Sequence, residues 1–171
     1  MRSFLLGLFL SLLVCFAAPG HAADKKQRKA DKYSNLEVST FDVSNDIEVP
    51  PDFLERLTKE LPHRLADTQK FKRVFDQGDT SADKSVPTLV MRGFLTDFTS
   101  GSRAKRYLVG FGAGAAEVVA HVKFVDAVTS EAIFERDITA KMSGGAFGGS
   151  TKGIADQLVK EIVKVVKRES F

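Results

Sequence analysis

The sequence predicts a single α+β domain, in which a mixed, largely antiparallel sheet of about five strands carries two helices on one face. Three observations predict this fold. Two segments have apolar residues at helical spacing, and five others alternate apolar and polar residues as strands do. These segments follow one another in the order β-α-β-β-β-β-α. Because each helix has only one apolar face, we expect both helices on the same side of the sheet.

The first half of the domain begins with "LEVSTFDV", residues 36–43, which alternates well enough for a strand. In the segment that follows, one helical face collects four leucines: Leu54, Leu57, Leu61 and Leu65. Pro51 suits the first turn of this helix, whereas Pro62 is expected to kink the helix or to end it early. The short run "FKRVF", residues 71–75, predicts the next strand, and strand, helix and strand together allow a parallel crossover.

The second half is predicted to be antiparallel, because its strands follow one another through short connections. "VPTLVMRGFLTDFTSG" is a long strand, and "AEVVAHVKFVDA" and "AIFERDITAKM" form a pair around the turn "DAVTSE". The first strand of this pair places four apolar residues on one face: Val118, Ala120, Val122 and Phe124. The last helix has Ser150 or Thr151 as its N-cap and an apolar stripe made of Ile154, Leu158, Ile162 and Val165.

The first 22 residues have the pattern of a signal peptide. Arg2 gives a positive start, an apolar run follows from Phe4 to Ala18, and small residues precede a cleavage site after Ala22. The run is shorter than the ~20 residues that a membrane span needs, so the mature chain is expected to have no transmembrane helix. Cys15 lies inside this run, so it does not predict lipidation. We expect an exported, periplasmic protein that is either free or peripheral on a membrane.

Charge divides the mature chain into two parts. Residues 23–35 form a basic segment that we expect to be a flexible tail, and residues 36–171 form the domain. From Tyr33 onward the chain has 19 basic and 20 acidic residues, so the folded part lacks the basic excess that nucleic-acid binding requires. The tail is either a solvated linker or a segment that is attracted to anionic lipid. Because the mature chain has no cysteine, its core alone must hold the fold.

Two glycine-rich signatures carry a resemblance to a known family. They are "GSRAKRYLVGFGAGAAEVVAHVKFVDAVTSEAIFE" and, further on, "MSGGAFGGS". From about Leu36 onward the chain resembles the exported bacterial proteins of domain-of-unknown-function family 4410. The resemblance implies a small α+β envelope domain, often in a lipoprotein, that acts by binding and assembly and has no established activity. This sequence departs from the family in lacking a lipidation cysteine and in having Ser130 where members usually have glycine.

The motifs of enzymes and of cofactor sites are missing or misplaced. Gly110, Gly112 and Gly114 have the wrong spacing for a dinucleotide fingerprint, and "GGSTK" has the wrong order for a phosphate-binding P-loop, so no nucleotide is expected. His63 and His121 show no metal-ligand spacing, and we expect no metal or other cofactor. Asp126 is expected to form a turn. Without a nucleophile, base or metal cluster, the sequence predicts a protein that is not an enzyme.

The stretch from Gly101 to Val119 has two interpretations. Alternate glycines remove side chains from one face, so the stretch can be a bend against which Phe147 packs. Alternatively, its basic cluster and the N-terminus of the last helix together contact a partner or an anion. The candidate residues for this contact are Arg103, Lys105, Arg106, Tyr107, Gly110, Phe111, Gly112, Gly114, Phe147, Ser150, Thr151 and Lys152.

Two hypotheses of function follow. The first is a non-enzymatic binding or assembly module of the cell envelope, with a protein partner. The second is a peripheral protein that binds anionic lipid through the basic tail and the Arg103–Arg106 cluster.

Overall fold

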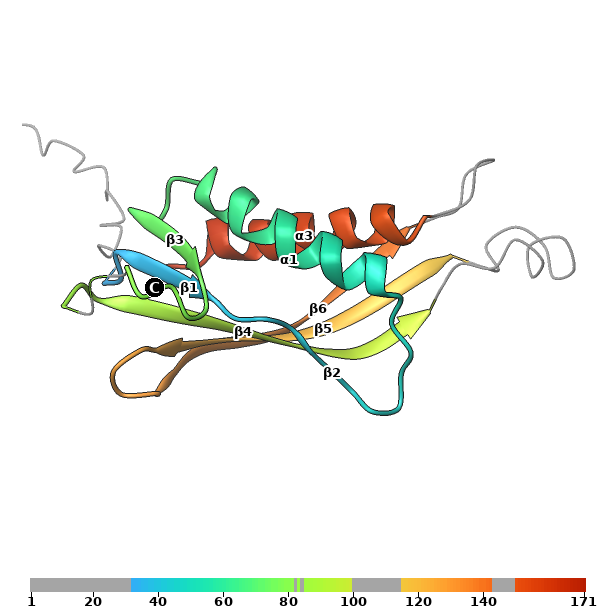
Figure 1. Cartoon of the computed structure of the whole chain (residues 1–171), viewed down its shortest axis with the longest axis horizontal. Helices are drawn as coiled ribbons and strands as arrows, with labels where there is room; N and C mark the ends of the chain where they lie inside the picture. The colour runs from blue at the N-terminus through green and yellow to red at the C-terminus, as the bar shows by residue number, and fades with distance from the viewer. Residues whose placement is uncertain (1–31, 82, 84, 100–114, 143–149) are drawn as a thin grey trace, which may run out of the picture.

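A computed structural model describes residues 32–171 except residues 82, 84, 100–114 and 143–149. The fold is a single α+β domain with two helices and a mixed six-stranded sheet, as the sequence predicts apart from one additional strand (Figure 1). The elements in chain order are β1 (Asn35–Val38), β2 (Asp42–Val43), α1 (Pro51–Ala66), β3 (Arg73–Asp76), β4 (Thr88–Thr99), β5 (Ala116–Asp126), β6 (Ala132–Met142) and α3 (Thr151–Arg168).

The sheet has the strand order β3-β1-β4-β5-β6, with β2 beside β4. β1 pairs in parallel with both β3 and β4, whereas β4, β5 and β6 are antiparallel. The parallel pairing of β1 with β3 across α1 is the crossover that the sequence allowed. Both helices lie on the same face of the sheet and pack against each other, which confirms the predicted layers (Figure 1).

The additional strand arises because the predicted strand 36–43 is interrupted. Between β1 and β2 the chain leaves the sheet at Ser39–Phe41, and the Phe41 ring, which is buried, packs over Gly93 of β4. A Cβ atom at Gly93 would lie only 2.2 Å from Cε1 of Phe41. A glycine in the middle of β4 therefore makes room for an aromatic ring that a side chain would exclude.

Helix α1 begins at Pro51 as expected but does not end early at Pro62. It continues to Ala66, and its buried residues are Phe53, Leu57, Leu61 and Leu65, so Phe53 takes the place expected for Leu54. Proline inside a helix costs about 3 kcal/mol, and full burial of a leucine contributes about 1.5–3 kcal/mol. The burial of Leu65 beyond the proline therefore offsets most of the loss.

Helix α3 confirms its predicted N-cap. The hydroxyl oxygen of Ser150 accepts a hydrogen bond from the backbone N–H of Gly153 at 3.0 Å. The buried stripe differs from the prediction at its last position, where Val166 is buried and Val165 only partly so. Within the described ranges, no helix is long and apolar enough to cross a membrane.

The core lies between the helices and one face of the sheet. On β5 the four residues predicted to share a face are fully buried: Val118, Ala120, Val122 and Phe124. On β6, Ile138 and Ala140 are buried, while Ala132 is exposed because the β5–β6 register shifts between Phe124 and Val125. Among the described residues, no helix lies on the opposite face of the sheet (Figure 1).

Candidate interaction surface

Nine of the twelve candidate contact residues lie outside the described residues: Arg103, Lys105, Arg106, Tyr107, Gly110, Phe111, Gly112, Gly114 and Phe147. The residues that flank their two segments are placed, however. Thr99 is opposite Glu117, and Ala116 is opposite Met142. The two glycine-rich segments therefore begin and end at the same end of the sheet, next to the first turn of α3 (Figure 1).

The other three candidates, Ser150, Thr151 and Lys152, lie at the start of α3. Asp52, in the first turn of α1, accepts a hydrogen bond from the Thr151 hydroxyl. This places a carboxylate beside the N-terminus of α3, where one of the two interpretations of the sequence put a contact with a partner or an anion. An acidic side chain near a helix N-terminus is favourable, so Asp52 already interacts with part of the positive potential that would attract an anion.

The basic tail joins the domain at the opposite end of the sheet. The backbone N–H of Lys32 donates a hydrogen bond to the carbonyl of Phe171. The Nζ of Lys32 lies 3.4 Å from Oδ2 of Asp126 at the end of β5. Asp126 and Ala116 are separated by the full length of β5, about 30 Å. The tail and the Arg103–Arg106 segment, which the lipid hypothesis combines in one surface, are therefore attached at opposite ends of the sheet.

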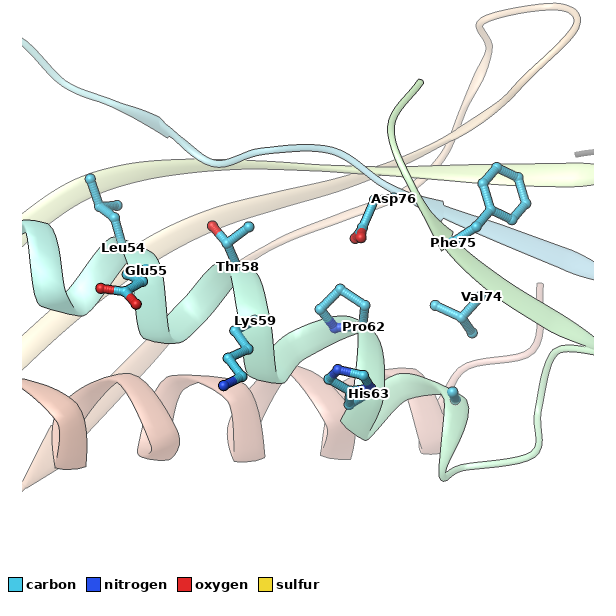
Figure 2. Close-up of a pocket in the computed structure, with 10 residues that line it drawn as sticks. Leu54, Glu55, Thr58, Lys59, Pro62, His63, Val74, Phe75 and Asp76 are labelled. Atoms are coloured by element: carbon cyan, nitrogen blue, oxygen red, sulfur yellow. The ribbon is translucent and has the colours of Figure 1, made fainter. Parts of the chain in front are cut away.

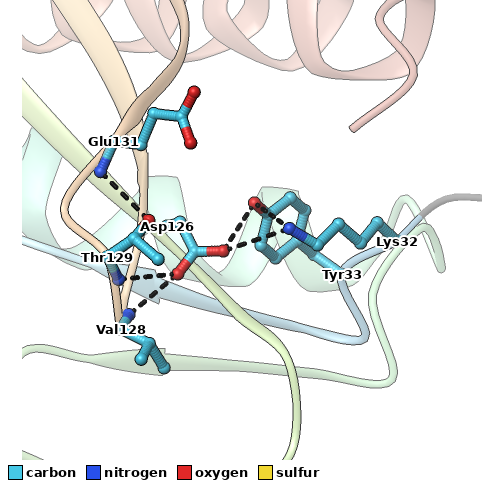
Figure 3. A network of polar contacts seen from close by, with 6 residues as sticks. All are labelled: Lys32, Tyr33, Asp126, Val128, Thr129 and Glu131. Carbon is cyan, nitrogen blue, oxygen red and sulfur yellow. Dashed lines mark hydrogen bonds and ion pairs between the residues drawn. The ribbon is translucent and has the colours of Figure 1, made fainter.

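Lys32 and Tyr33 belong to a polar network around Asp126 (Figure 3). The Tyr33 hydroxyl donates to the Asp126 carboxylate at 2.8 Å, and the backbone N–H groups of Val128 and Thr129 donate to it at 2.9 and 3.0 Å. These two backbone bonds confirm that Asp126 forms the turn. Tyr33 is 3% exposed, so the fold begins before the predicted boundary at residue 36.

Hydrogen bonding and burial shift the pKa values of this network. The hydrogen bond from Thr129, followed by those from Tyr33 and Val128, holds the pKa of the Asp126 carboxyl far below its usual range. Burial, and next the hydrogen bond to Asp126, raises the pKa of the Tyr33 hydroxyl. The hydrogen bond with Tyr33, and next that with Asp126, raises the pKa of Lys32. The network therefore stabilises an ionised carboxylate that links the N-terminal segment to the β5–β6 turn.

A groove of about 640 Å³ lies between α1 and β3 (Figure 2). Leu54, Thr58 and Pro62, spaced by four residues, line one side, and Val74 lines the other. His63 also lines this groove. The four-residue spacing was the only sign in the sequence of this second stripe on α1.

The uncovered face of the sheet carries a ladder of charged and polar side chains. Because the even-numbered residues of β5 are buried under the helices, its odd-numbered residues point to the other side. Three contacts join them to directly opposite residues of β6. Glu117 and Lys141 form an ion pair at 3.1 Å, Lys123 and Glu135 form another at 3.7 Å, and Nδ1 of His121 lies within hydrogen-bond distance of Asp137 at 2.7 Å. These pairs stabilise the β5–β6 register.

Phe94 gives this face an apolar centre. It lies opposite His121 on β4, and its side chain is 41% exposed. We use the name open face for the outward side chains of Arg92, Phe94, Glu117, His121, Lys123, Glu135, Asp137 and Lys141. Aromatic residues are enriched at protein contact sites, where a polar rim surrounds the apolar centre.

Sequence reasoning missed the open face as a candidate site. The alternation in β5 placed His121 and Lys123 on one side of the strand, but their partners on β6 depended on the strand register. The acidic residues Glu135 and Asp137 are two positions apart and therefore share one side of β6, and that spacing was the available signal. Among the described residues, no group of three or more His, Cys, Asp or Glu side chains is placed to hold a metal.

Several solved structures are similar to this chain in fold. The PelC dodecamer from Paraburkholderia phytofirmans is 10% identical, with a TM-score of 0.52 over 78% of this chain and 88% of that chain. Protein XCC0632 from Xanthomonas campestris is 13% identical, with a TM-score of 0.51 over 81% and 82%. The hypothetical protein CT253 from Chlamydia trachomatis is 11% identical, with a TM-score of 0.53 over 79% and 96%.

None of these three structures is named as an enzyme. No curated protein matches this sequence. Residues 26–154, most of the chain, match a family model, and this range contains both glycine-rich signatures of the sequence. This chain therefore belongs to the family described as Domain of unknown function (DUF4410).

Proposed function

We propose that this protein is a non-enzymatic binding and assembly module of the bacterial cell envelope, and that its open face contacts a partner protein. The observation that carries the proposal is the exposed Phe94 at the centre of a charged sheet face that no helix of the described part of the chain covers. A partner suited to this face offers an apolar residue for Phe94 and charges of both signs for the ladder around it.

The envelope location is supported by the pattern of the first 22 residues and by the exported proteins that the sequence resembles. Assembly is supported by the fold that the chain shares with PelC, which is a dodecamer. These observations favour a role in which the protein acts by binding to other proteins.

The exposure and the position of the histidine and carboxylate side chains on the open face support a role without catalysis. The best acid–base pair on the open face is His121 with Asp137, whose side chains are 39% and 72% exposed. Both lie in a row of polar contacts between adjacent strands, with an ion pair on either side, which accounts for their position without a substrate. A catalytic pair is more commonly found in a cleft that excludes water.

Crosslinking in the bacterium that encodes the protein tests the proposal. The full chain would be recovered with an antibody, so that no tag alters the fold. Three forms would be compared: the wild type, Phe94→Asp on the open face, and Val128→Asp at the tip of the β5–β6 turn, where the side chain is 85% exposed. Unchanged circular dichroism spectra would establish that the variants fold.

We expect one discrete crosslinked complex in the wild type and in Val128→Asp, and its loss in Phe94→Asp. A wild type without any crosslinked partner would overturn the assembly role. A complex that survives Phe94→Asp would move the contact away from the open face, and recovery of the mature protein in the cytoplasmic fraction would overturn the envelope location.

A further inference from the structure

Strand β6 is a long edge of the sheet. It spans Ala132–Met142, and within the described part of the chain it pairs with β5 only. The other edge, β3, has only four residues. An edge strand presents unpaired backbone N–H and C=O groups, which makes it a template for pairing with another strand.

We propose that β6 pairs with β6 of a second copy of this chain, antiparallel and with Ile138 on the two-fold axis. This goes beyond the proposed function, because it joins the backbone edges of two sheets and names a different partner, a second copy of this chain. An isologous contact of this kind closes on itself, so it gives a dimer with a continuous sheet and the helices of both copies on one side.

Charge complementarity on the open face supports this register. With Ile138 opposite itself, Glu135 of one copy lies opposite Lys141 of the other, and this occurs twice because of the symmetry. Glu135 already pairs with Lys123 and Lys141 with Glu117 within each copy. The row across four strands then reads Lys123, Glu135, Lys141 and Glu117, so the charge alternates at every step.

The helix side of β6 is complementary in the same register. Ile138 of one copy contacts Ile138 of the other, and Phe134 of one copy lies opposite Met142 of the other. Phe134 and Met142 are only partly buried in the single chain, so they have surface left to cover. Arg136, the remaining charge on this side, lies opposite the small Ala140, and its guanidinium is 3.8 Å from Glu169 within its own copy.

The two neighbouring registers are less favourable. Moving the axis to Asp137 places the Asp137 carboxylates of the two copies opposite each other, and like charges directly opposite are destabilising. Moving it to Thr139 shortens the ladder, leaves Glu135 without an opposite residue in β6, and places Arg136 opposite Met142. Charges on an edge usually prevent pairing between sheets. On β6, however, the antiparallel register centred on Ile138 places the acidic Glu135 of one copy opposite the basic Lys141 of the other, so the charges favour this pairing.

Two charge-reversal variants of the full chain provide the test. Glu135→Lys alone would place lysine opposite lysine across the axis, and Lys141→Glu alone would place glutamate opposite glutamate. A mixture of the two variants restores both opposite-charge pairs, because each copy then supplies one sign. The mixture has the same repulsion within each chain as the separate variants, so any difference reports the contact between copies. Arg92→Glu, on the inner strand β4, is the control.

Sedimentation velocity over a range of concentrations would be the measurement. We expect a wild-type dimer, dimerisation weakened about tenfold to a hundredfold in each variant alone, and recovery in the mixture. A wild type that stays monomeric up to its solubility limit would overturn the proposal. Dimers that neither variant weakens, or a mixture that stays monomeric, would also overturn it. Oligomers larger than a dimer would overturn it as well, because they indicate pairing of β6 with β3.

The two proposals fail separately. Phe94→Asp is expected to leave the sedimentation coefficient unchanged and to lose only the crosslinked envelope partner. Loss of the partner with retention of the dimer would therefore concern the open face alone, and a wild type that keeps its partner but stays monomeric would overturn the β6 contact alone.

Discussion

Replacing Gly93 by alanine tests the packing that divides the first strand into β1 and β2. The new Cβ would lie 2.2 Å from Cε1 and 2.4 Å from Cδ1 and Cζ of Phe41. Carbon atoms pack at about 3.5–4.0 Å, so the ring would have to move by more than about 1 Å. Phe41 is 8% exposed, which leaves little space for such a movement without a shift of the backbone.

The expected loss is about 1–2 kcal/mol in the free energy of unfolding. Overpacking a core typically costs about 1–3 kcal/mol, and loss of a buried phenylalanine surface is of the same order. Alanine in a strand recovers about 0.5–1 kcal/mol relative to glycine, which lowers the net effect. The remaining change is a large fraction of the stability of a small domain.

Urea unfolding followed by far-ultraviolet circular dichroism would measure this loss, because the chain has no tryptophan to report by fluorescence. Gly153→Ala is the matched control. Its Cβ would meet the terminal Cε of Met142, the flexible end of a side chain that can move aside. We expect Gly153→Ala to lie within about 0.5 kcal/mol of the wild type or to be more stable.

A double variant distinguishes steric conflict from other effects of alanine. Phe41→Leu removes the ring, so Gly93→Ala should cost much less in its presence, with a coupling energy of about 1 kcal/mol. Equal stability of Gly93→Ala and the wild type would refute the reasoning. Strictly additive effects in the double variant would also refute it.

Three other predictions follow from the turn, the network around Asp126 and the glycine-rich segments. Ser130 has φ +59°, a left-handed conformation that favours glycine, so Ser130→Gly should raise the free energy of unfolding by about 0.5–1 kcal/mol in the same urea assay. Asp126→Asn should lower stability at neutral pH and flatten its decrease in acid. The folded pKa of Asp126 is depressed, so its contribution is present above the ordinary carboxyl pKa of about 3.9 and is lost as pH falls below it; equal acid slopes for the wild type and Asp126→Asn would contradict this. The triple variant Arg103→Ala, Lys105→Ala and Arg106→Ala tests the lipid hypothesis by flotation with anionic and neutral liposomes. Salt-sensitive binding that the variant loses would support a lipid contact, and no binding by the wild type would exclude it.

Much of the fold could be predicted from local patterns. Alternation in β5 correctly placed four residues in the core: Val118, Ala120, Val122 and Phe124. This succeeds because a strand turns successive side chains to opposite faces whatever its partners are. The N-cap at Ser150 was also predictable, because its hydroxyl bonds to a backbone group only three residues away. Errors occurred at the margins of the helices. Whether Leu54 or Phe53 is buried depends on how α1 is rotated against the sheet, and the helical pattern alone does not decide that rotation.

The candidate site was less predictable because its contacts are distant in sequence. His121 and Asp137 are 16 residues apart, Tyr33 and Asp126 are 93 apart, and Thr151 and Asp52 are 99 apart. The sequence indicated which residues were polar and on which side of a strand they lay. Only the pairing of β5 with β6 joined them into a ladder, and only the burial of Tyr33 moved the start of the fold into the expected tail.

The sequence by itself determined the two helices, the apolar faces and the antiparallel second half, since these depend on residue spacing and on interactions within a few residues. The tertiary structure decided that β1 lies between β3 and β4 and that β6 is left at the edge. Strand order depends on the sum of backbone and side-chain contacts over the whole sheet, and several orders are compatible with the same local patterns. The open face and the edge at which we propose that two copies meet are consequences of that order.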